Sequence, residues 1–280
     1  MAANAAVRNL LIVFGAPAQN SMTVMVRRPM QDLPFVIVAG GKGTRMRPLT
    51  ERVPKALLTV AGVPLLDRQL DWLRKQGVRR VVVCLGHLSE PIESHLATTA
   101  AARGLDIAIS LEGDSSLGTA GAVRLAIERG LLVDRFLTLY GDTIPSLDLA
   151  AAMEHWNSSG APALLCVFPA SGQRDEARAL VHSGRVTRFS RHPLPGEVES
   201  NTHGDYGVAG FHSSQFAHLL PWVRGGFGTI HADLARRGDL VAYDVGVGPL
   251  EVGTMDGYKR AELIWASTAS SNDGISSSNL

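Results

Sequence analysis

Short apolar runs alternate with amphipathic stretches from Phe35 onward, and this alternation constrains the fold of the chain more than any other feature. Short apolar runs are typical of buried strands, and apolar residues at three- and four-residue spacing are typical of helices. Strands that alternate with helices wind into a sheet that is mainly parallel and flanked by helices. We therefore predict an α/β fold with strands at residues 35–39, 81–85, 106–110, 136–140 and 163–168, and later near 185–189, 206–211 and 240–244.

Turn and cap residues indicate where the helices begin and end. Leucines recur at helical spacing between the first two predicted strands, and Gly77 is expected to end that helix. Ser89, followed by Pro91 in the first turn, and Thr119 are expected to cap the next two helices. The leucines are Leu66, Leu70 and Leu73.

No linker divides the chain, so we predict a single domain over residues 33–268. Residues 1–32 are expected to be a disordered extension or the product of an over-long start, although LLIVFGAPA after Arg8 has some features of a signal peptide. Residues 192–204 are predicted to form a loop. Residues 269–280 lack apolar periodicity and are predicted to be a disordered tail.

The charge pattern bears on partners and location. The 27 basic and 26 acidic residues give a net charge of +1 and are spread along the chain, so no global field would collect nucleic acid or an anionic membrane. Cys84 and Cys166 lie within apolar runs, which predicts buried, reduced thiols and a cytoplasmic protein. No apolar run approaches the roughly 18–20 residues that a membrane span needs.

A glycine-rich loop, AGGKGTRMRPLT at residues 39–50, follows the first predicted strand directly. Glycines allow backbone amides to approach a polyphosphate and permit positive φ angles. Ligands bind beyond the carboxyl ends of strands in open α/β sheets, which is where this loop lies. Arg45 and Lys55 add positive charge beside it, so the loop is predicted to bind phosphate.

Other interpretations of the loop are weaker. A Walker A loop needs Ser or Thr after its lysine, whereas Lys42 is followed by glycine. A dinucleotide-binding loop needs a third glycine and an acid about 20 residues further on, and neither is present. A turn without chemistry would explain the glycines but not the arginine, proline and lysine that follow.

The loop and the following PKALLTVAGVPLLDRQLDWLRKQGV resemble the opening of the sugar-1-phosphate nucleotidylyltransferase family. The resemblance continues through LGHLSEPIESHL, SLGTAGAV, LYGDT and VGTMDGYKRAE, and ends near residue 262. It implies a Rossmann-like mixed sheet of the nucleotide-diphospho-sugar transferase type. It also implies Mg²⁺ as cofactor, and a nucleoside triphosphate and a sugar 1-phosphate as substrates.

The resemblance assigns roles to the loop and to two cations. Arg45 would stabilise charge on the reacting phosphates, and Lys55 would contact the nucleotidyl and sugar phosphates. The loop residues that would hold the triphosphate are Ala39, Gly40, Gly41, Gly43 and Thr44.

Two further segments complete the expected nucleotide and metal sites. Asp142 follows the strand FLTLY, so its carboxylate is expected at the same edge of the sheet, and the resemblance makes it a Mg²⁺ ligand. Capping of the following turn is the alternative for Asp142. Glu112, Gly118 and Thr119 resemble the segment that receives the base and ribose; alternatively, Glu112 is an exposed acid at a strand end.

The chain departs from the family pattern at the second metal ligand and on the acceptor side. Glu251 replaces an aspartate that binds metal, and Asp244 is a candidate substitute. RHP replaces EKP, which puts His192 at the position of a sugar-phosphate lysine and Arg191 beside it. Val208 replaces an asparagine of the sugar site, to which Gly141 also belongs by resemblance.

The expected reaction is attack by an oxygen of the sugar 1-phosphate on the α-phosphorus of the triphosphate, with loss of pyrophosphate. The resemblance favours GTP and a heptose or mannose-type sugar. A uridylyl-, adenylyl- or cytidylyltransferase of the same family and a catalytically weak nucleotide-sugar-binding regulatory subunit remain alternatives, and a nicotinamide dehydrogenase is a remote one. A homo-oligomer is compatible with the sequence, although no residue pattern indicates one.

Overall fold

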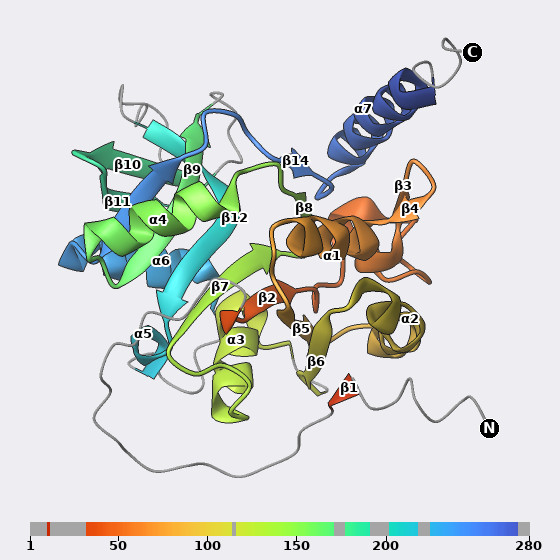
Figure 1. Cartoon of the computed structure of the whole chain (residues 1–280), viewed down its shortest axis with the longest axis horizontal. Coiled ribbons are helices and arrows are strands. Elements are labelled where there is room, and N and C mark those ends of the chain that lie inside the picture. Colours follow the sequence, from red (N-terminus) through yellow and green to blue (C-terminus); the bar gives the residue numbers. More distant parts are fainter. Residues whose placement is uncertain are drawn as a thin grey trace, which may run out of the picture.

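The computed structural model describes residues 10–11, 32–113, 116–170, 177–190, 202–217 and 225–273. A ten-stranded sheet runs through the molecule, and helices pack on both of its faces (Figure 1). The strand order is β1-β6-β5-β2-β7-β12-β10-β11-β13-β9. The chain is thus a mixed α/β protein, as the alternation of strands and helices predicts.

One half of the sheet is parallel. It contains β2 (Phe35–Val38), β5 (Arg80–Leu85), β6 (Asp106–Leu111) and β7 (Arg135–Tyr140), with β2 between β5 and β7. The apolar runs fall in these strands because both faces of this half are covered by helices. At its edge, β1 (Leu10–Leu11) pairs in parallel with β6, which differs from the disordered extension predicted for residues 1–32.

The other half of the sheet is mostly antiparallel, so the prediction of a mainly parallel sheet is wrong here. Its strands are β9 (Ala163–Pro169), β10 (Arg178–His182), β11 (Arg185–Ser190), β12 (Thr202–His212) and β13 (Leu240–Asp244). Within this half, only β9 and β13 pair in parallel. A two-residue hairpin turn, Ser183–Gly184, has positive φ at both residues and reverses the chain between β10 and β11.

The eight predicted strands are confirmed, whereas β10 is not among the predictions. Strand β12 begins at Thr202, so the predicted loop over residues 192–204 is wrong for its last three residues; residues 192–201 lie outside the described part of the chain. The C-terminal helix continues through residues 269–273, where a disordered tail is predicted. The helices are α1 (Leu65–Lys75), α2 (Ser89–Arg103), α3 (Gly118–Glu128), α4 (Leu149–Ser159), α5 (Ser214–Ala217), α6 (Phe227–Arg237) and α7 (Met255–Asp273).

Two hydrophobic cores cover the two faces of the sheet. Alternate residues of β2 point to opposite faces, so Phe35 and Ile37 join the core under α1, α2 and α4, while Val36 joins the core under α3, α5 and α6. Cys84 and Cys166 are buried free thiols, as predicted, and burial raises the pKa of Cys84 to about 12. Among the described residues, no helix is long and apolar enough to cross a membrane.

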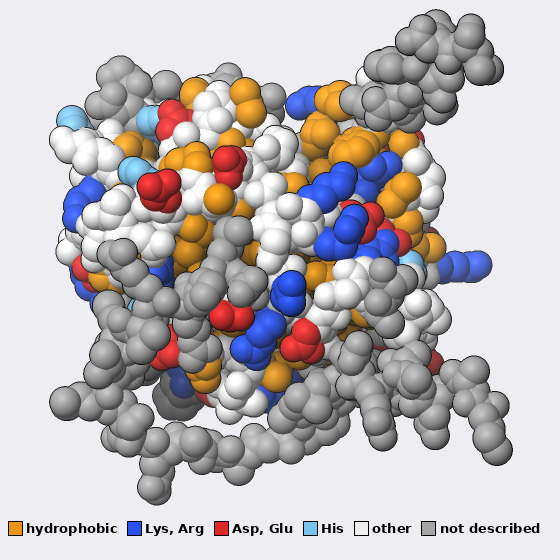
Figure 2. Space-filling model, viewed as in Figure 1, with side chains coloured by type: hydrophobic (Ala, Val, Ile, Leu, Met, Phe, Trp, Pro, Cys, Tyr) orange, Lys and Arg blue, Asp and Glu red, His pale blue; other side chains and the backbone are white. Residues whose placement is uncertain are grey.

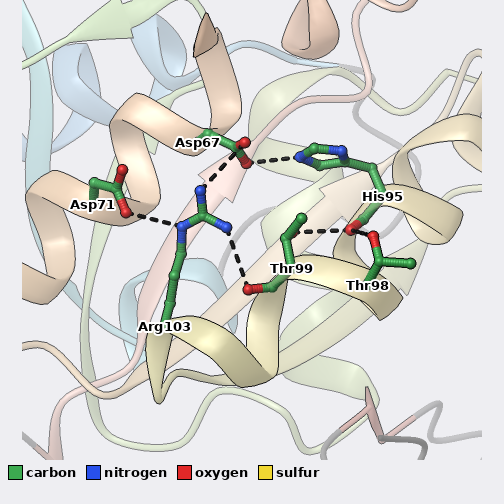
Figure 3. Close-up of polar contacts among 6 residues, drawn as sticks. All are labelled: Asp67, Asp71, His95, Thr98, Thr99 and Arg103. Atoms are coloured by element: carbon green, nitrogen blue, oxygen red, sulfur yellow. Dashed lines mark hydrogen bonds and ion pairs between the residues drawn. The ribbon is translucent and has the colours of Figure 1, made fainter. Parts of the chain in front are cut away.

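A polar network joins α1 to α2 on one side of the molecule (Figure 3). Arg103 of α2 reaches between Asp67 and Asp71 of α1, with nitrogen–oxygen distances of 3.2 and 2.9 Å, and His95 lies 2.7 Å from Asp67. Because these groups bond to one another, they fix α1 rather than offering a free site. On the face drawn in Figure 2, basic and acidic side chains lie among one another.

Candidate active site

Three charged side chains from distant parts of the sequence meet around Gly253. Lys55 donates a hydrogen bond to Asp142 over 2.7 Å. A methyl group on Gly253 would lie 3.3 Å from Oδ2 of Asp142, 3.5 Å from Nη2 of Arg45 and 3.9 Å from Nζ of Lys55. The structure therefore brings together the three residues predicted to be catalytic. Gly253 itself was missed by the sequence reasoning, although it belongs to the VGT motif.

The position of Asp142 is set by close backbone packing at the end of β7. The N–H of Gly141 donates to the carbonyl of Val38 over 3.0 Å, and a Cβ at Gly141 would lie only 2.6 Å from that carbonyl oxygen. Val252 donates to the carbonyl of Asp142 over 2.8 Å. Asp142 thus lies at the carboxyl edge of the parallel strands, as predicted, held between β2 and the segment that carries Gly253.

The glycine-rich loop is shaped by Gly43 and Thr50. Gly43 has a φ of +60° and begins a 3-10 turn, Thr44–Met46, that carries Arg45. The buried hydroxyl of Thr50 donates to the carbonyl of Gly43 over 2.7 Å, and Met46 is fully buried. A Cβ at Gly41 would meet no atom within 4 Å, so internal packing does not require glycine there. The loop is fixed from beneath while its outer side stays open.

Glu112 lies against the loop rather than in solvent. A Cβ at Gly40 would lie 2.3 Å from Oε1 of Glu112, and Oε2 accepts a hydrogen bond from the N–H of Leu117 over 2.8 Å. Burial raises the pKa of Glu112, and the bond from Leu117 partly offsets this. The alternative of an exposed acid is therefore wrong, because this carboxylate joins the loop to the turn before α3.

Gly118 and Thr119 contact the start of α6. A Cβ at Gly118 would lie 2.8 Å from the carbonyl oxygen of Gly225, which accepts from the N–H of Ala120 over 3.0 Å. The hydroxyl of Thr119 accepts from the N–H of Phe227 over 2.9 Å and makes no capping bond to α3. The prediction that Thr119 caps α3 is therefore wrong; contact of these residues with a base stays a prediction.

The two candidates for a second metal ligand lie in different places. Glu251 is exposed on β14 (Leu250–Glu251), opposite Thr143 of β8 (Thr143–Ile144), and so lies on the strand pair that follows Asp142. Asp244 accepts from the N–H of Gly246 over 2.9 Å and lies 3.7 Å from His203, so it is occupied at the turn after β13. Placement favours Glu251 over Asp244.

The residues present fit a Mg²⁺ ion. The described residues contain no group of three or more histidine, cysteine or acidic side chains that could enclose a metal. Mg²⁺ needs no such cage, because it is usually bound by one or two carboxylates together with substrate phosphates and water. Asp142 already holds a cationic group, the ammonium of Lys55. Asp142 fits one ligand of such a site, and Glu251, on the strand that pairs with the residues after Asp142, is the candidate for a second.

Among the residues predicted to bind the sugar and its phosphate, Val208 is not brought to this site. Val208 is fully buried opposite Leu139 and belongs to the hydrophobic core under α1, α2 and α4, so the prediction that it contacts the sugar is wrong. Tyr206 and Val208 alternate onto this face of β12, while Ala209 and Phe211 face the opposite core. Arg191 and His192 lie outside the described residues.

Restoring the family asparagine at this position should therefore harm the protein. We expect Val208→Asn to lower the free energy of unfolding by about 1–3 kcal/mol, because a buried amide would lack partners. Urea unfolding measures this, with Val247→Asn as the control, since Val247 is 61% exposed. An unchanged unfolding midpoint together with faster turnover would show that the side chain at 208 faces the sugar.

Comparisons with known proteins show the family to which the chain belongs. Residues 35–206 match the family model described as nucleotidyl transferase. The chain is 30% identical to a UTP–glucose-1-phosphate uridylyltransferase of Synechocystis over 59% of the chain and 45% of the relative. It is 33% identical to a mannose-1-phosphate guanylyltransferase catalytic subunit beta of Danio rerio over 56% and 44%. It is also 39% identical to an N-acetylmuramate α-1-phosphate uridylyltransferase of Neisseria meningitidis over 42% and 51%, so the matches span about half of each relative.

Two solved structures share the fold. A Bacillus anthracis protein described as a glucose-1-phosphate thymidylyltransferase, solved with sucrose, matches with a TM-score of 0.74 over 83% of this chain and 94% of its own, at 21% identity. HddC of Yersinia pseudotuberculosis, solved with GMP-PN, matches with a TM-score of 0.66 over 83% and 99%, at 19% identity. The family match covers residues 35–206, more than half of the chain, so the chain belongs to the nucleotidyl transferase family of sugar-1-phosphate nucleotidylyltransferases.

Proposed function

We propose that this protein transfers the nucleotidyl group of a nucleoside triphosphate, with GTP favoured, to a heptose or mannose-type sugar 1-phosphate and releases pyrophosphate. The observation that carries the proposal is the meeting of Arg45, Lys55 and Asp142 around Gly253, beside the glycine-rich loop. Two cations and a carboxylate at the carboxyl edge of the sheet suit a reaction between two phosphorylated substrates.

The reaction needs alignment and charge neutralisation more than proton transfer. An oxygen of the sugar phosphate forms a bond to the α-phosphorus as the bond from that phosphorus to the pyrophosphate oxygen breaks. The attacking oxygen is already ionised at neutral pH, so no general base is required. Arg45 and Lys55 would neutralise the reacting phosphates, and the loop amides would hold the triphosphate. Mg²⁺, when bound at Asp142 and Glu251, supplies further charge neutralisation.

The preference for GTP is supported by Glu112. Guanine presents two neighbouring donors on one edge, N1–H and the N2 amino group, and a carboxylate has acceptor sites for both. Only one oxygen of Glu112 is bonded to Leu117, and the carboxylate lies against the loop. A guanylyltransferase and a protein solved with a guanine nucleotide are among the similar proteins, but so are uridylyltransferases.

Pyrophosphate release tests the proposal directly. The purified protein with Mg²⁺ would be given each of the four triphosphates against a panel of hexose and heptose 1-phosphates. We expect release with one pair, and loss of release in Asp142→Ala. Release with UTP alone would overturn the choice of base but keep the reaction. Silence across the panel, in a protein that still binds a nucleotide or nucleotide sugar, would favour the regulatory alternative.

Replacing Glu112 with glutamine should change the choice of base. We expect Glu112→Gln to lower kcat/KM for GTP by about tenfold to a hundredfold, the usual effect of losing hydrogen bonds to a charged group. The ratio of UTP to GTP turnover should rise, because glutamine offers one donor and one acceptor. Competition between the two triphosphates measures that ratio.

Stability provides the control for this variant. Burial raises the pKa of Glu112, so its stabilising contribution is present below the unfolded pKa and is lost as the pH rises through the folded pKa. A neutral glutamine should therefore not lower Tm near neutral pH. An unchanged ratio of UTP to GTP turnover would remove Glu112 from base recognition.

A further inference from the structure

Gln69 of α1 is fully buried and reaches the turn that carries Asp142. Its amide nitrogen donates to the carbonyl of Tyr140 over 2.9 Å and to the carbonyl of Thr143 over 2.7 Å. These two carbonyls flank Gly141 and Asp142. The opposite orientation of the amide would put Oε1 against two carbonyl oxygens, so the hydrogen-bond network fixes the amide as described. One side chain thus spans both ends of the Asp142 turn.

The position does not need a polar residue for packing. Gln69 lies beside Leu66, Leu70 and Leu73, which are all fully buried. Within the described residues, its Oε1 has no hydrogen-bond partner, and burying such an acceptor unpaired costs about 1–3 kcal/mol. An apolar side chain of similar length would avoid that cost. A buried polar group that weakens the core locally is typical of a functional site.

The two bonds act on the direction in which Asp142 points. The backbone of the turn itself makes two hydrogen bonds, from Gly141 to Val38 and from Val252 to Asp142. Gln69 adds side-chain hydrogen bonds from α1, a helix that Arg103 holds against α2. The planar amide has two hydrogens in fixed directions, so it sets the spacing of the two carbonyls.

We propose that Gln69 is a positioning residue that orients the Asp142 carboxylate and so sets the affinity of the site for a divalent cation. This inference rests on the proposed function, in which Asp142 binds Mg²⁺. Gln69 touches neither substrate nor metal, and it acts through the backbone of residues 140–143. Small errors in ligand position are costly because Mg²⁺ demands near-ideal geometry.

The test compares Gln69 in α1 with Gln76, the residue that directly follows α1. Gln69→Met keeps the length of the side chain and removes both donors. Gln76→Met is the matched control, because Gln76 also bonds one backbone group, accepting from the N–H of Leu149 at the start of α4 over 3.0 Å. The loss of the free-ion EPR signal of Mn²⁺ measures the affinity of the site for a divalent cation without turnover. It is recorded with the triphosphate present and absent. The Mg²⁺ concentration for half-maximal pyrophosphate release measures the metal requirement during turnover.

We expect Gln69→Met to weaken Mn²⁺ binding by about tenfold and to raise the Mg²⁺ requirement by a similar factor in a protein that still folds. Gln76→Met should bind Mn²⁺ as the unmodified protein does. Normal Mn²⁺ binding by Gln69→Met, or equal losses in both variants, would overturn the proposal. If Gln69→Met does not fold, Gln69→Leu repeats the test, and failure of both to fold would make the role structural. An unmodified protein that binds Mn²⁺ but is silent with every substrate pair would refute the proposed function alone.

Discussion

Asp142→Asn is expected to lower kcat for pyrophosphate release by at least about a thousandfold while the protein stays folded. Asparagine keeps the size of the side chain but removes the negative charge that the proposed reaction needs to hold Mg²⁺. It also removes the ionic partner of Lys55, which lies 2.7 Å from Oδ2. The Asp142 side chain is partly buried, at 30% exposure, and asparagine can still accept a hydrogen bond from Lys55, so Tm should change little.

Steady-state pyrophosphate release over a range of Mg²⁺ concentrations measures the loss. Asp106→Asn is the matched control, because the side chain of Asp106 is 66% exposed and its contact with Arg80 is long, at 3.9 Å. The control should retain full activity. A loss of less than tenfold in Asp142→Asn, at saturating Mg²⁺, would mean that another group binds the metal or that no metal takes part.

The sequence predicts the parallel half of the sheet well because that half is buried on both faces. Each strand there is a nearly continuous apolar run, such as RVVVCL in β5. A strand with one face in solvent would alternate apolar and polar residues instead. Strand β10, RALVH, was missed because its run is short and begins with a buried arginine, Arg178. The antiparallel half depends on the hairpin at Ser183–Gly184 and on long-range pairing of β12, which local periodicity does not encode.

The site was predictable wherever a side chain carries charge in a recognisable motif. Arg45, Lys55 and Asp142 were found in this way, and the structure brings them together. Gln69 and Thr50 were missed because their roles depend on backbone carbonyls that only the folded chain places beside them. Val208 was misassigned because the sequence motif does not show that this residue pairs with Leu139 on a core face of the sheet. Sequence patterns thus predict the charged residues of the candidate site more readily than the residues that hold them in place.

Lys55→Met should separate the two roles that the Lys55–Asp142 pair combines. In the structure, the ammonium of Lys55 is bonded to the carboxylate of Asp142, which the proposed reaction needs for Mg²⁺. Both side chains are partly buried: Lys55 is 15% exposed and Asp142 is 30% exposed. We expect the ion to displace Lys55 from Asp142, and Lys55 is then free to contact phosphate. Removal of Lys55 frees the carboxylate but takes away a charge that the proposed reaction uses to neutralise the phosphates.

We expect Lys55→Met to lower kcat by about a hundredfold to a thousandfold, the usual effect of losing one charge-stabilising group. At the same time, the Mg²⁺ concentration for half-maximal activity should fall, because Asp142 no longer has an internal cation as competitor. Residual activity titrated with Mg²⁺ measures both changes, and Lys75→Met, at the exposed end of α1, is the control that should leave them unaltered. A lower kcat with an unchanged or higher Mg²⁺ requirement would show that Lys55 does not compete with the ion, and Lys55 would then act on phosphate alone.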